Sequence, residues 1–308
     1  MGIISRTYVK RFVGRQDKEL GVPYYAVSDF KGLKQEAFSF NNSKGIEIKY
    51  FYYYYENYKQ DKIILFLPGL GPGHVSYLRE INLLAERGYR VLTIDYTGCG
   101  ESKGEYLASL NNPPRDVMEL LNLLKLKEEI VLIGHSLGGY TALKVASLCE
   151  DIKKVVVFAP LINIRPLIYN ASKSKLITHY VLKYERKVGK EYDEIDLPKF
   201  LQTTTKDIFF IQSEDDPIVP YSSSLKVAEE THNSHIKTLR LNGRRHNPNY
   251  TDEAVKYMNE VFGKYNELLA SKKIKETSDK IAYFKDVSID KLTEQDQDLF
   301  GQIFTFIN

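Results

Sequence analysis

The stretch that decides the fold is EEIVLIGHSLGGYTALKVASL, residues 128–148. Its first half is a short aliphatic run typical of a buried strand, and its second half is predicted to form a helix. Ser136 stands at the junction in the pattern G-x-S-x-G, formed with Gly134 and Gly138. Bulky residues at these two positions would clash with neighbouring backbone, so the pattern predicts a tight turn that holds the Ser136 hydroxyl above the sheet edge. An ordinary glycine-rich turn with a helix-capping serine is the alternative.

The rest of the chain alternates strand-like and helix-like segments. This alternation predicts βαβ units and a mostly parallel central sheet with helices on both faces. Such sheets bind ligands outside the carboxyl ends of their strands, where the Ser136 turn lies. Strands are expected at residues 46–55, 62–67, 90–94, 129–133, 154–158, 207–211 and 236–241, and helices at 77–87, 115–126, 137–148, 225–231 and 252–269.

We expect a single domain over residues 1–308, with a core at about 36–270. Residues 161–206 interrupt the alternation, and a structureless loop of that length would be unusual. We interpret them as a cap insertion of two or three short helices that walls the substrate pocket; a decorative insertion is the alternative. Residues before about 35 lie outside the regular pattern, and residues 271–308 form a C-terminal extension expected to pack on the core.

A serine nucleophile needs a base, and the base needs a third group to orient it. In a fold of this kind the acid and then the histidine follow the serine along the chain. Asp215 and Asp216 follow the strand DIFFIQ, and His246 follows the strand IKTLRL. We prefer Asp216 as the acid because Pro217 fixes the backbone directly after it, and Asp215 stays open as the alternative.

The other five histidines fit a catalytic base less well. His135 lies inside the turn and is expected to point away from the Ser136 hydroxyl and to be packed. His74 follows a glycine-rich loop and could touch substrate, and His179 lies in the cap. His232 and His235 precede a strand, at the wrong edge of the sheet.

The loop Pro68–Gly73 directly follows the strand KIILFL. Its glycines let the backbone approach a substrate closely. We expect an oxyanion hole made by two backbone N–H groups, those of Leu70 and Leu137. A phosphate-cradling loop is excluded because no Gly-Lys-Ser/Thr follows and no G-x-G-x-x-G pattern is present.

Composition limits the other functions. The chain has 43 basic and 40 acidic residues, a net charge of +3, which is too small to indicate a nucleic-acid partner. Its two cysteines, Cys99 and Cys149, form neither a disulfide framework nor a zinc pattern, so no metal or other cofactor is expected. No apolar run is long enough for a signal segment or a membrane span, and a cytoplasmic location is the expectation.

Taken together, these motifs resemble the α/β-hydrolase superfamily, in its serine aminopeptidase-like or monoacylglycerol-lipase-like branch. The resemblance covers roughly residues 40–265, implies the α/β-hydrolase fold and matches the acid to Asp216. Pro68 stands where the family often has a histidine, which leaves a backbone N–H role intact. The matching segments are LPGLG at 67–71, DYTGCGES at 95–102, GHSLGG at 134–139, DDPIVP at 215–220 and RRHN at 244–247.

The expected function is a serine hydrolase that cleaves carboxylic esters of a small or medium apolar acyl substrate through an acyl-enzyme. Ser136 would be the nucleophile, His246 the base and Asp216 the orienting acid, and the partner would be a small-molecule ester.

Two alternatives stay open. A peptidase or amidase could use acidic cap residues to bind a free amine, although we interpret these residues as a solvated face. A non-catalytic binding protein on the same fold is the second. The acidic cap residues are Glu185, Glu191, Asp193, Glu194 and Asp196.

Overall fold

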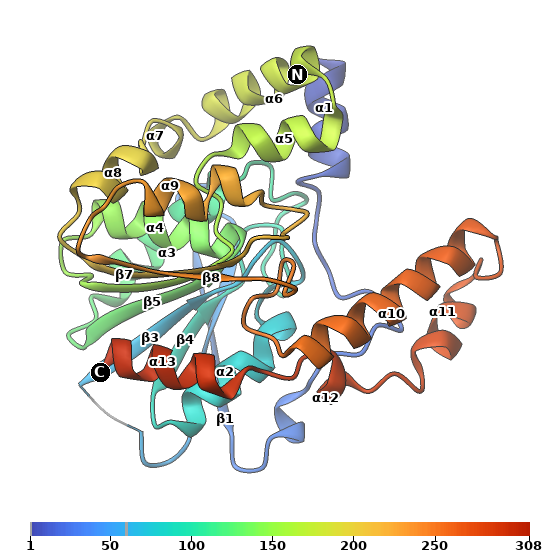
Figure 1. Ribbon diagram of the computed structural model, residues 1–308, viewed down its shortest axis with the longest axis horizontal. Helices are drawn as coiled ribbons and strands as arrows, with labels where there is room; N and C mark the ends of the chain where they lie inside the picture. The colour runs from blue at the N-terminus through green and yellow to red at the C-terminus, as the bar shows by residue number, and fades with distance from the viewer. Residues whose placement is uncertain (1, 59–60) are drawn as a thin grey trace.

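The computed structural model describes residues 2–58 and 61–308. Across these residues an eight-stranded sheet in the order β1-β2-β4-β3-β5-β6-β7-β8 forms the centre of the molecule (Figure 1). β2 runs antiparallel to both β1 and β4, and the remaining neighbours are parallel, which confirms the predicted sheet. The strands are β1 Lys34–Asn41, β2 Glu47–Tyr54, β3 Lys62–Leu67, β4 Arg90–Ile94, β5 Glu129–His135, β6 Lys154–Phe158, β7 Asp207–Ser213 and β8 Ile236–Leu241.

Helices cover both faces of the sheet because both faces of its central strands are apolar. Along β3, Ile63 and Leu65 point into one core cluster, and Ile64 and Phe66 point into the other. Helices α3, α4 and α9 pack on the first face, and α2 and α13 pack on the second (Figure 1). The bounds are α2 Leu78–Glu86, α3 Asn112–Leu124, α4 Leu137–Leu148, α9 Leu225–Glu229 and α13 Gln297–Ile307, with short 3-10 turns η1 Val27–Asp29, η2 Gly73–Tyr77 and η3 Tyr221–Ser223.

The N-terminal part of the chain is more regular than its sequence indicates. We expected residues before about 35 to lie outside the pattern, whereas helix α1 spans Ile3–Arg11 and strand β1 begins at Lys34. β1 is an edge strand with no fully buried residue, so it lacks the alternation that marks a half-buried strand. α1 buries only Tyr8 and Val9, too few to give a helical pattern.

Residues 161–206 contain four helices, α5 Ile164–Ser172, α6 Lys175–Val188, α7 Lys190–Asp193 and α8 Leu197–Thr203. α1 packs against α6, and α1, α5 and α6 lie together at the top of Figure 1. Glu185 of α6 is fully buried there, so its expected place on a solvated face was wrong. Its carboxylate accepts hydrogen bonds from Tyr8 Oη at 2.7 Å, Ser109 Oγ at 2.6 Å and the Leu110 N–H at 3.1 Å, which compensate its burial.

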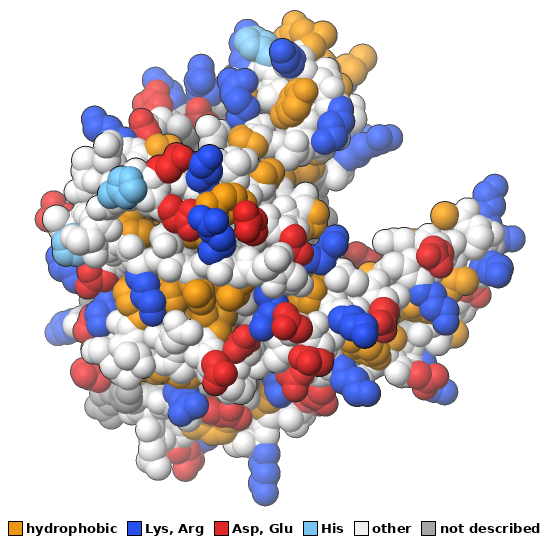
Figure 2. Space-filling model, viewed as in Figure 1, with side chains coloured by type: hydrophobic (Ala, Val, Ile, Leu, Met, Phe, Trp, Pro, Cys, Tyr) orange, Lys and Arg blue, Asp and Glu red, His pale blue; other side chains and the backbone are white. Residues whose placement is uncertain are grey.

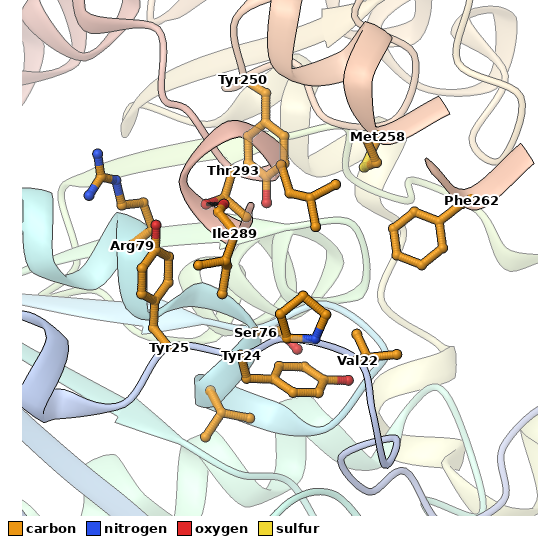
Figure 3. A pocket seen from close by; sticks show the side chains of 13 residues that line it. Val22, Tyr24, Tyr25, Ser76, Arg79, Tyr250, Met258, Phe262, Ile289 and Thr293 are labelled. Atoms are coloured by element: carbon orange, nitrogen blue, oxygen red, sulfur yellow. Dashed lines mark hydrogen bonds between the residues drawn. The ribbon is translucent and has the colours of Figure 1, made fainter. Parts of the chain in front are cut away.

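A helical arm extends to the right of the molecule in Figure 1. It consists of α10 Asp252–Ala270, α11 Thr277–Phe284 and α12 Ile289–Leu292. Val261, Phe284 and Leu292 form a small core of their own within the arm. At its base lies a cavity of about 160 Å³, lined by residues that include Tyr24, Tyr25 and Phe262 (Figure 3).

No helix in residues 2–58 and 61–308 is long and apolar enough to cross a bilayer.

Candidate active site

Ser136 occupies a strained turn between β5 and α4. Its φ is 54° and its ψ is −113°, a conformation that costs a non-glycine residue on the order of 1–3 kcal/mol. The backbone of β6 and of the loop after it holds the turn in place. The Ser136 N–H donates to the Phe158 carbonyl at 2.8 Å, and the Ser136 carbonyl accepts from the Leu161 N–H at 3.4 Å.

The two glycines of the motif are required by close backbone approach. A Cβ at Gly138 would overlap the carbonyl oxygen of Leu67, and a Cβ at Gly134 would overlap that of Gly138. Both contacts are with backbone, which cannot move aside without displacing β3 or α4. Residues 134–138 therefore form the tight strand-to-helix turn that the sequence predicts.

Ser136 and His246 line the same cavity, which has a volume of about 280 Å³. Leu70 and Leu137, whose N–H groups we expected to bind an oxyanion, line it as well. The rest of the wall is mostly apolar, and two of its residues, Leu161 and Leu167, come from the cap segment 161–206. These further lining residues include Phe12, Leu110, Leu161, Leu167 and Ile218.

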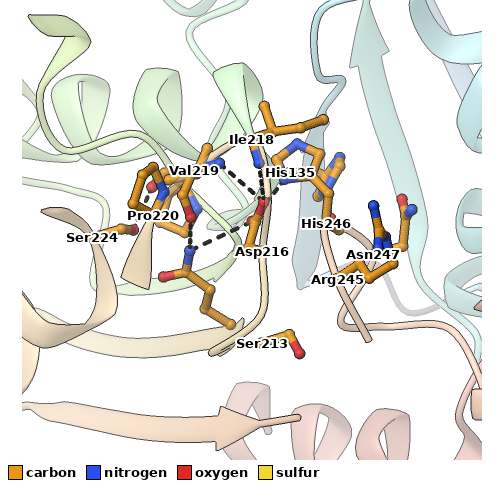
Figure 4. Close-up of polar contacts among 12 residues, drawn as sticks. His135, Ser213, Asp216, Ile218, Val219, Pro220, Ser224, Arg245, His246 and Asn247 are labelled. Carbon is orange, nitrogen blue, oxygen red and sulfur yellow. Dashed lines mark hydrogen bonds and ion pairs between the residues drawn. The ribbon is translucent and has the colours of Figure 1, made fainter. Parts of the chain in front are cut away.

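Asp216 contacts the imidazole of His246 directly. Its Oδ2 lies 2.8 Å from His246 Nδ1, and its Oδ1 accepts the N–H groups of Ile218 at 2.8 Å and Val219 at 3.0 Å (Figure 4). The Asp216 side chain is fully buried, so these bonds fix the orientation of its carboxylate. Because Asp216 engages Nδ1, Nε2 is the ring nitrogen that remains available for another hydrogen bond. Within the described residues the Ser136 hydroxyl makes no hydrogen bond to this ring, as is common before substrate binds.

Asp215 takes different partners. Its Oδ1 accepts hydrogen bonds from Ser213 Oγ, from the Gly243 N–H at 3.0 Å and from the Arg245 N–H at 3.2 Å. These bonds anchor the loop that carries His246 without touching the imidazole. The geometry thus favours Asp216 over Asp215 as the partner of the base.

The glycine-rich loop after β3 leaves one backbone donor free. The Gly69 N–H donates to Tyr77 Oη at 3.1 Å, whereas the Leu70 N–H has no acceptor in the part of the chain that the structure describes. The Leu137 N–H lies in the first turn of α4, where helix N–H groups lack intrahelical partners. Both donors belong to residues of the cavity wall, as binding an oxyanion requires.

His135 connects this loop to the loop of His246, a role that the sequence did not indicate. Its Nε2 lies 2.7 Å from the carbonyl oxygen of His246, which can only accept, so Nε2 carries the proton. Its Nδ1, 2.8 Å from Tyr77 Oη, therefore accepts from the tyrosine. Burial, with the adjacent His246 as a smaller cause, lowers the pKa of His135 to about 3, which keeps the ring neutral. The chain of bonds runs from Gly69 N–H through Tyr77 and His135 to the backbone of His246.

His74 lies outside the cavity, contrary to the possibility that it touches substrate. Its ring is 2% exposed, packs on Phe51 and places Nδ1 2.9 Å from Asp95 Oδ1. Asp95 also accepts the Glu101 N–H at 2.9 Å, and Ser102 Oγ donates to the Asp95 carbonyl at 2.6 Å. The 95–102 segment thus uses its polar groups to hold its own turn beside the site.

The remaining histidines contribute nothing to this cavity. His179 is exposed on α6, His232 lies in the turn before β8, and His235 pairs with Asp207 at 2.9 Å. In residues 2–58 and 61–308, no cluster of three or more His, Cys, Asp or Glu side chains is arranged to hold a metal ion.

Known proteins resemble this chain in sequence and in fold. Residues 58–193 match the family model described as "Serine aminopeptidase, S33". A Haemophilus influenzae protein whose name assigns it to the esterases and lipases is 31% identical over 108 residues, which cover 35% of this chain and 36% of that protein. An Arabidopsis thaliana protein named for a chloroplastic methylesterase is 28% identical over 141 residues, which cover 45% of this chain and 37% of that protein. The chain thus spans little more than a third of the length of these curated relatives.

Solved structures extend the likeness to most of the chain. An esterase of Pyrococcus furiosus superposes with a TM-score of 0.59 and 18% identity, covering 83% of this chain and 98% of its own. At that identity the likeness establishes the fold. Together with the mostly parallel sheet, this likeness gives the chain the α/β-hydrolase fold, and its residues 58–193 match the model of the serine aminopeptidase family.

Proposed function

We propose that this hydrolase cleaves carboxylic esters of a small or medium apolar acyl group through a covalent acyl-enzyme. The observation that carries the proposal is the cavity itself. It joins Ser136, an imidazole paired with a buried carboxylate, and two backbone donors to a mostly apolar wall of about 280 Å³.

In the first half of the reaction, the Ser136 Oγ attacks the ester carbonyl carbon while His246 Nε2 takes the hydroxyl proton. The carbonyl oxygen becomes an oxyanion held by the N–H groups of Leu70 and Leu137. The C–O bond to the alcohol then breaks, and His246 returns the proton to the departing alcohol. In the second half, water attacks the acyl-enzyme by the same steps and releases the carboxylic acid and the free serine.

Asp216 supports both halves by its contact with Nδ1. An ionised carboxylate there keeps the proton on Nδ1 and leaves Nε2 unprotonated, ready to accept. It also stabilises the imidazolium that forms when His246 takes the proton. The two backbone N–H bonds on Asp216 Oδ1 hold the carboxylate in that position throughout.

The aminopeptidase alternative has less support from the cavity. A free amine needs an acceptor, and none of the described residues that line the cavity is acidic. The side chain of Glu185 already forms hydrogen bonds with Tyr8, Ser109 and Leu110. We therefore propose ester cleavage ahead of amide cleavage.

A fluorophosphonate probe tests the nucleophile, and paired substrates test the bond. We expect the probe to label the protein and the label to disappear in Ser136→Ala. We expect p-nitrophenyl esters to be turned over faster than aminoacyl p-nitroanilides. An unlabelled wild-type protein would refute the serine mechanism, and faster anilide turnover would refute the ester preference.

A further inference from the structure

Positive charge is concentrated on one part of the molecule. Residues 2–11 and 164–190, which form α1, α5 and α6 and reach into α7, contain ten Lys and Arg residues and one acid, the buried Glu185. The whole chain has 43 basic and 40 acidic residues, so the remainder has 33 and 39 and is net acidic. The ten are Arg6, Lys10, Arg11, Arg165, Lys173, Lys175, Lys183, Arg186, Lys187 and Lys190.

These ten side chains are exposed and hardly neutralised. Among them, only Arg186 has a salt bridge in the described part of the chain, to Asp193 at 3.4 Å. Figure 2 shows Lys and Arg side chains gathered with hydrophobic ones over this part of the molecule, at the top of the view. We call the exposed surface of residues 2–11 and 164–190 the basic cap face.

Large apolar side chains project from the same face. Ile3 is 83% exposed, Leu176 is 64% exposed and Tyr180 is 46% exposed, with Tyr169 and Ile177 close to 40%. Between α1 and α5–α6 the face is hollowed into an apolar groove of about 300 Å³. Large apolar side chains that are exposed together among charged ones are typical of an interaction surface rather than of a surface that faces only water.

We propose that the basic cap face docks on an anionic lipid bilayer. Aliphatic side chains such as Leu176 and Ile3 would enter the acyl boundary, and tyrosines suit the headgroup level. The lysines and arginines would meet the negative surface of the membrane.

Charge argues against the other occupants. A second copy of the chain on this face would bring ten cations against ten, which repel. A nucleic acid would neutralise the cations but leave Ile3 and Leu176 in water, since base stacking uses aromatic rings. Only the lipid surface satisfies both kinds of side chain.

The docked orientation follows from the neighbours of the face. Phe12, directly after α1, lines both the apolar groove and the cavity of Ser136, and Leu167 of α5 lines that cavity. Docking would place that cavity near the lipid headgroups. The docking itself does not depend on the reaction proposed for Ser136, because its readout is vesicle binding.

Co-sedimentation of the full chain with vesicles tests the proposal. We expect pelleting with phosphatidylcholine vesicles that contain phosphatidylglycerol and little with phosphatidylcholine alone. The triple change Lys175→Glu, Lys183→Glu and Lys187→Glu should weaken binding by roughly a hundredfold or more. Leu176→Ser with Tyr180→Ser should also weaken it, by about tenfold.

Matched variants separate docking from general charge and from misfolding. Lys264→Glu, Lys273→Glu and Lys275→Glu change the same charge on the arm, and Leu123→Ser removes an exposed leucine of α3. Both controls should bind as wild type, and all variants should keep the wild-type circular dichroism spectrum.

Three results would overturn the proposal. The first is equal pelleting with both vesicle types, and the second is a loss of binding in the arm variant as large as in the cap variant. The third is no vesicle binding together with a dimer, seen by light scattering, that Leu176→Ser with Tyr180→Ser abolishes. The third result would assign the face to a second copy of the chain.

Discussion

Two neighbouring carboxylates, Asp215 and Asp216, have separate structural tasks. Asp216 holds the imidazole of His246, and Asp215 holds the backbone of the loop that carries it. The difference arises because successive side chains at the end of β7 point in different directions. The Asp216 side chain points toward His246, and the Asp215 side chain points toward residues 243–245.

Matched amide substitutions should therefore differ strongly in effect. Asp216→Asn cannot stabilise the imidazolium and favours the wrong tautomer, so kcat for p-nitrophenyl esters should fall by about 10³- to 10⁴-fold. Asp215→Asn keeps a carbonyl oxygen that can accept the loop N–H groups, so kcat should fall by less than about tenfold. Steady-state kinetics on both variants measure this, and equal losses would contradict the assignment of Asp216.

The Tyr77 hydroxyl is the junction between the Gly69 N–H and His135. Tyr77→Phe removes the acceptor of the Gly69 N–H and the donor to His135 Nδ1. The loop that carries the Leu70 N–H can then shift. We expect kcat to fall by about tenfold with little change in KM, because misplaced donors weaken transition-state binding most. Tyr221→Phe removes another hydrogen-bonded hydroxyl, on Glu229, and should leave kcat unchanged. A loss confined to KM would contradict the role of Tyr77.

At the scale of elements, helix α6 of the cap is linked to helix α1 and to the core through the carboxyl group of Glu185. Burial raises the pKa of Glu185 to about 7, and its hydrogen bonds oppose this rise. The folded protein thus holds a proton on this group at pH values where the unfolded chain has lost it. The stability linked to Glu185 is complete below about pH 4.5 and is lost as the pH rises to about 7.

Glu185→Gln removes this titration. The free energy of unfolding of the variant, relative to wild type, should rise between pH 5 and pH 8 by up to about 3 kcal/mol. Urea unfolding at both pH values measures the difference. Glu191→Gln, at an exposed position of α7, should leave the wild-type pH dependence unchanged. A pH-independent difference for Glu185→Gln would mean that the folded protein does not hold this proton.

The elements that the sequence predicted are those with a strong local pattern. β3 and α4 begin and end where the aliphatic run 62–67 and the helical segment 137–148 do. α1 and β1 were missed because their positions depend on tertiary contacts, α1 on the cap and β1 on pairing with β2.

In the candidate site, too, the features with a local sequence pattern were predicted and those that depend on tertiary packing were not. Chain order and strand ends predicted the loops that carry Ser136, Asp216 and His246, and their catalytic roles stay predictions. The partnership of Tyr77 with His135 depends on how η2 packs beside β5. No local pattern in the sequence encodes that packing.

At the scale of the whole molecule, α13 covers the second face of the sheet next to α2 (Figure 1). It buries Leu299, Phe300, Ile303, Phe304 and Ile307, and α10 leaves this face free because it extends into the arm. Residues 297–307 therefore complete the layer that encloses Phe158 and Phe209.

Phe300→Ala should destabilise the protein by about 3–5 kcal/mol, because it opens a cavity beside Phe158 and Phe304. Thr305→Ala, at an exposed position of the same helix, should change stability by less than about 0.5 kcal/mol. Thermal or urea unfolding measures both. A small effect of Phe300→Ala would show that α13 contributes little to enclosing the core.

The arm of α10, α11 and α12 has its own small core around Phe284, separate from the clusters on the two faces of the sheet. A segment with a separate core can open without exposing the main one. Amides in α11 and α12 should therefore exchange hydrogen with solvent through a local opening of low free energy. Those of β3 and β5 should exchange only when the whole sheet unfolds.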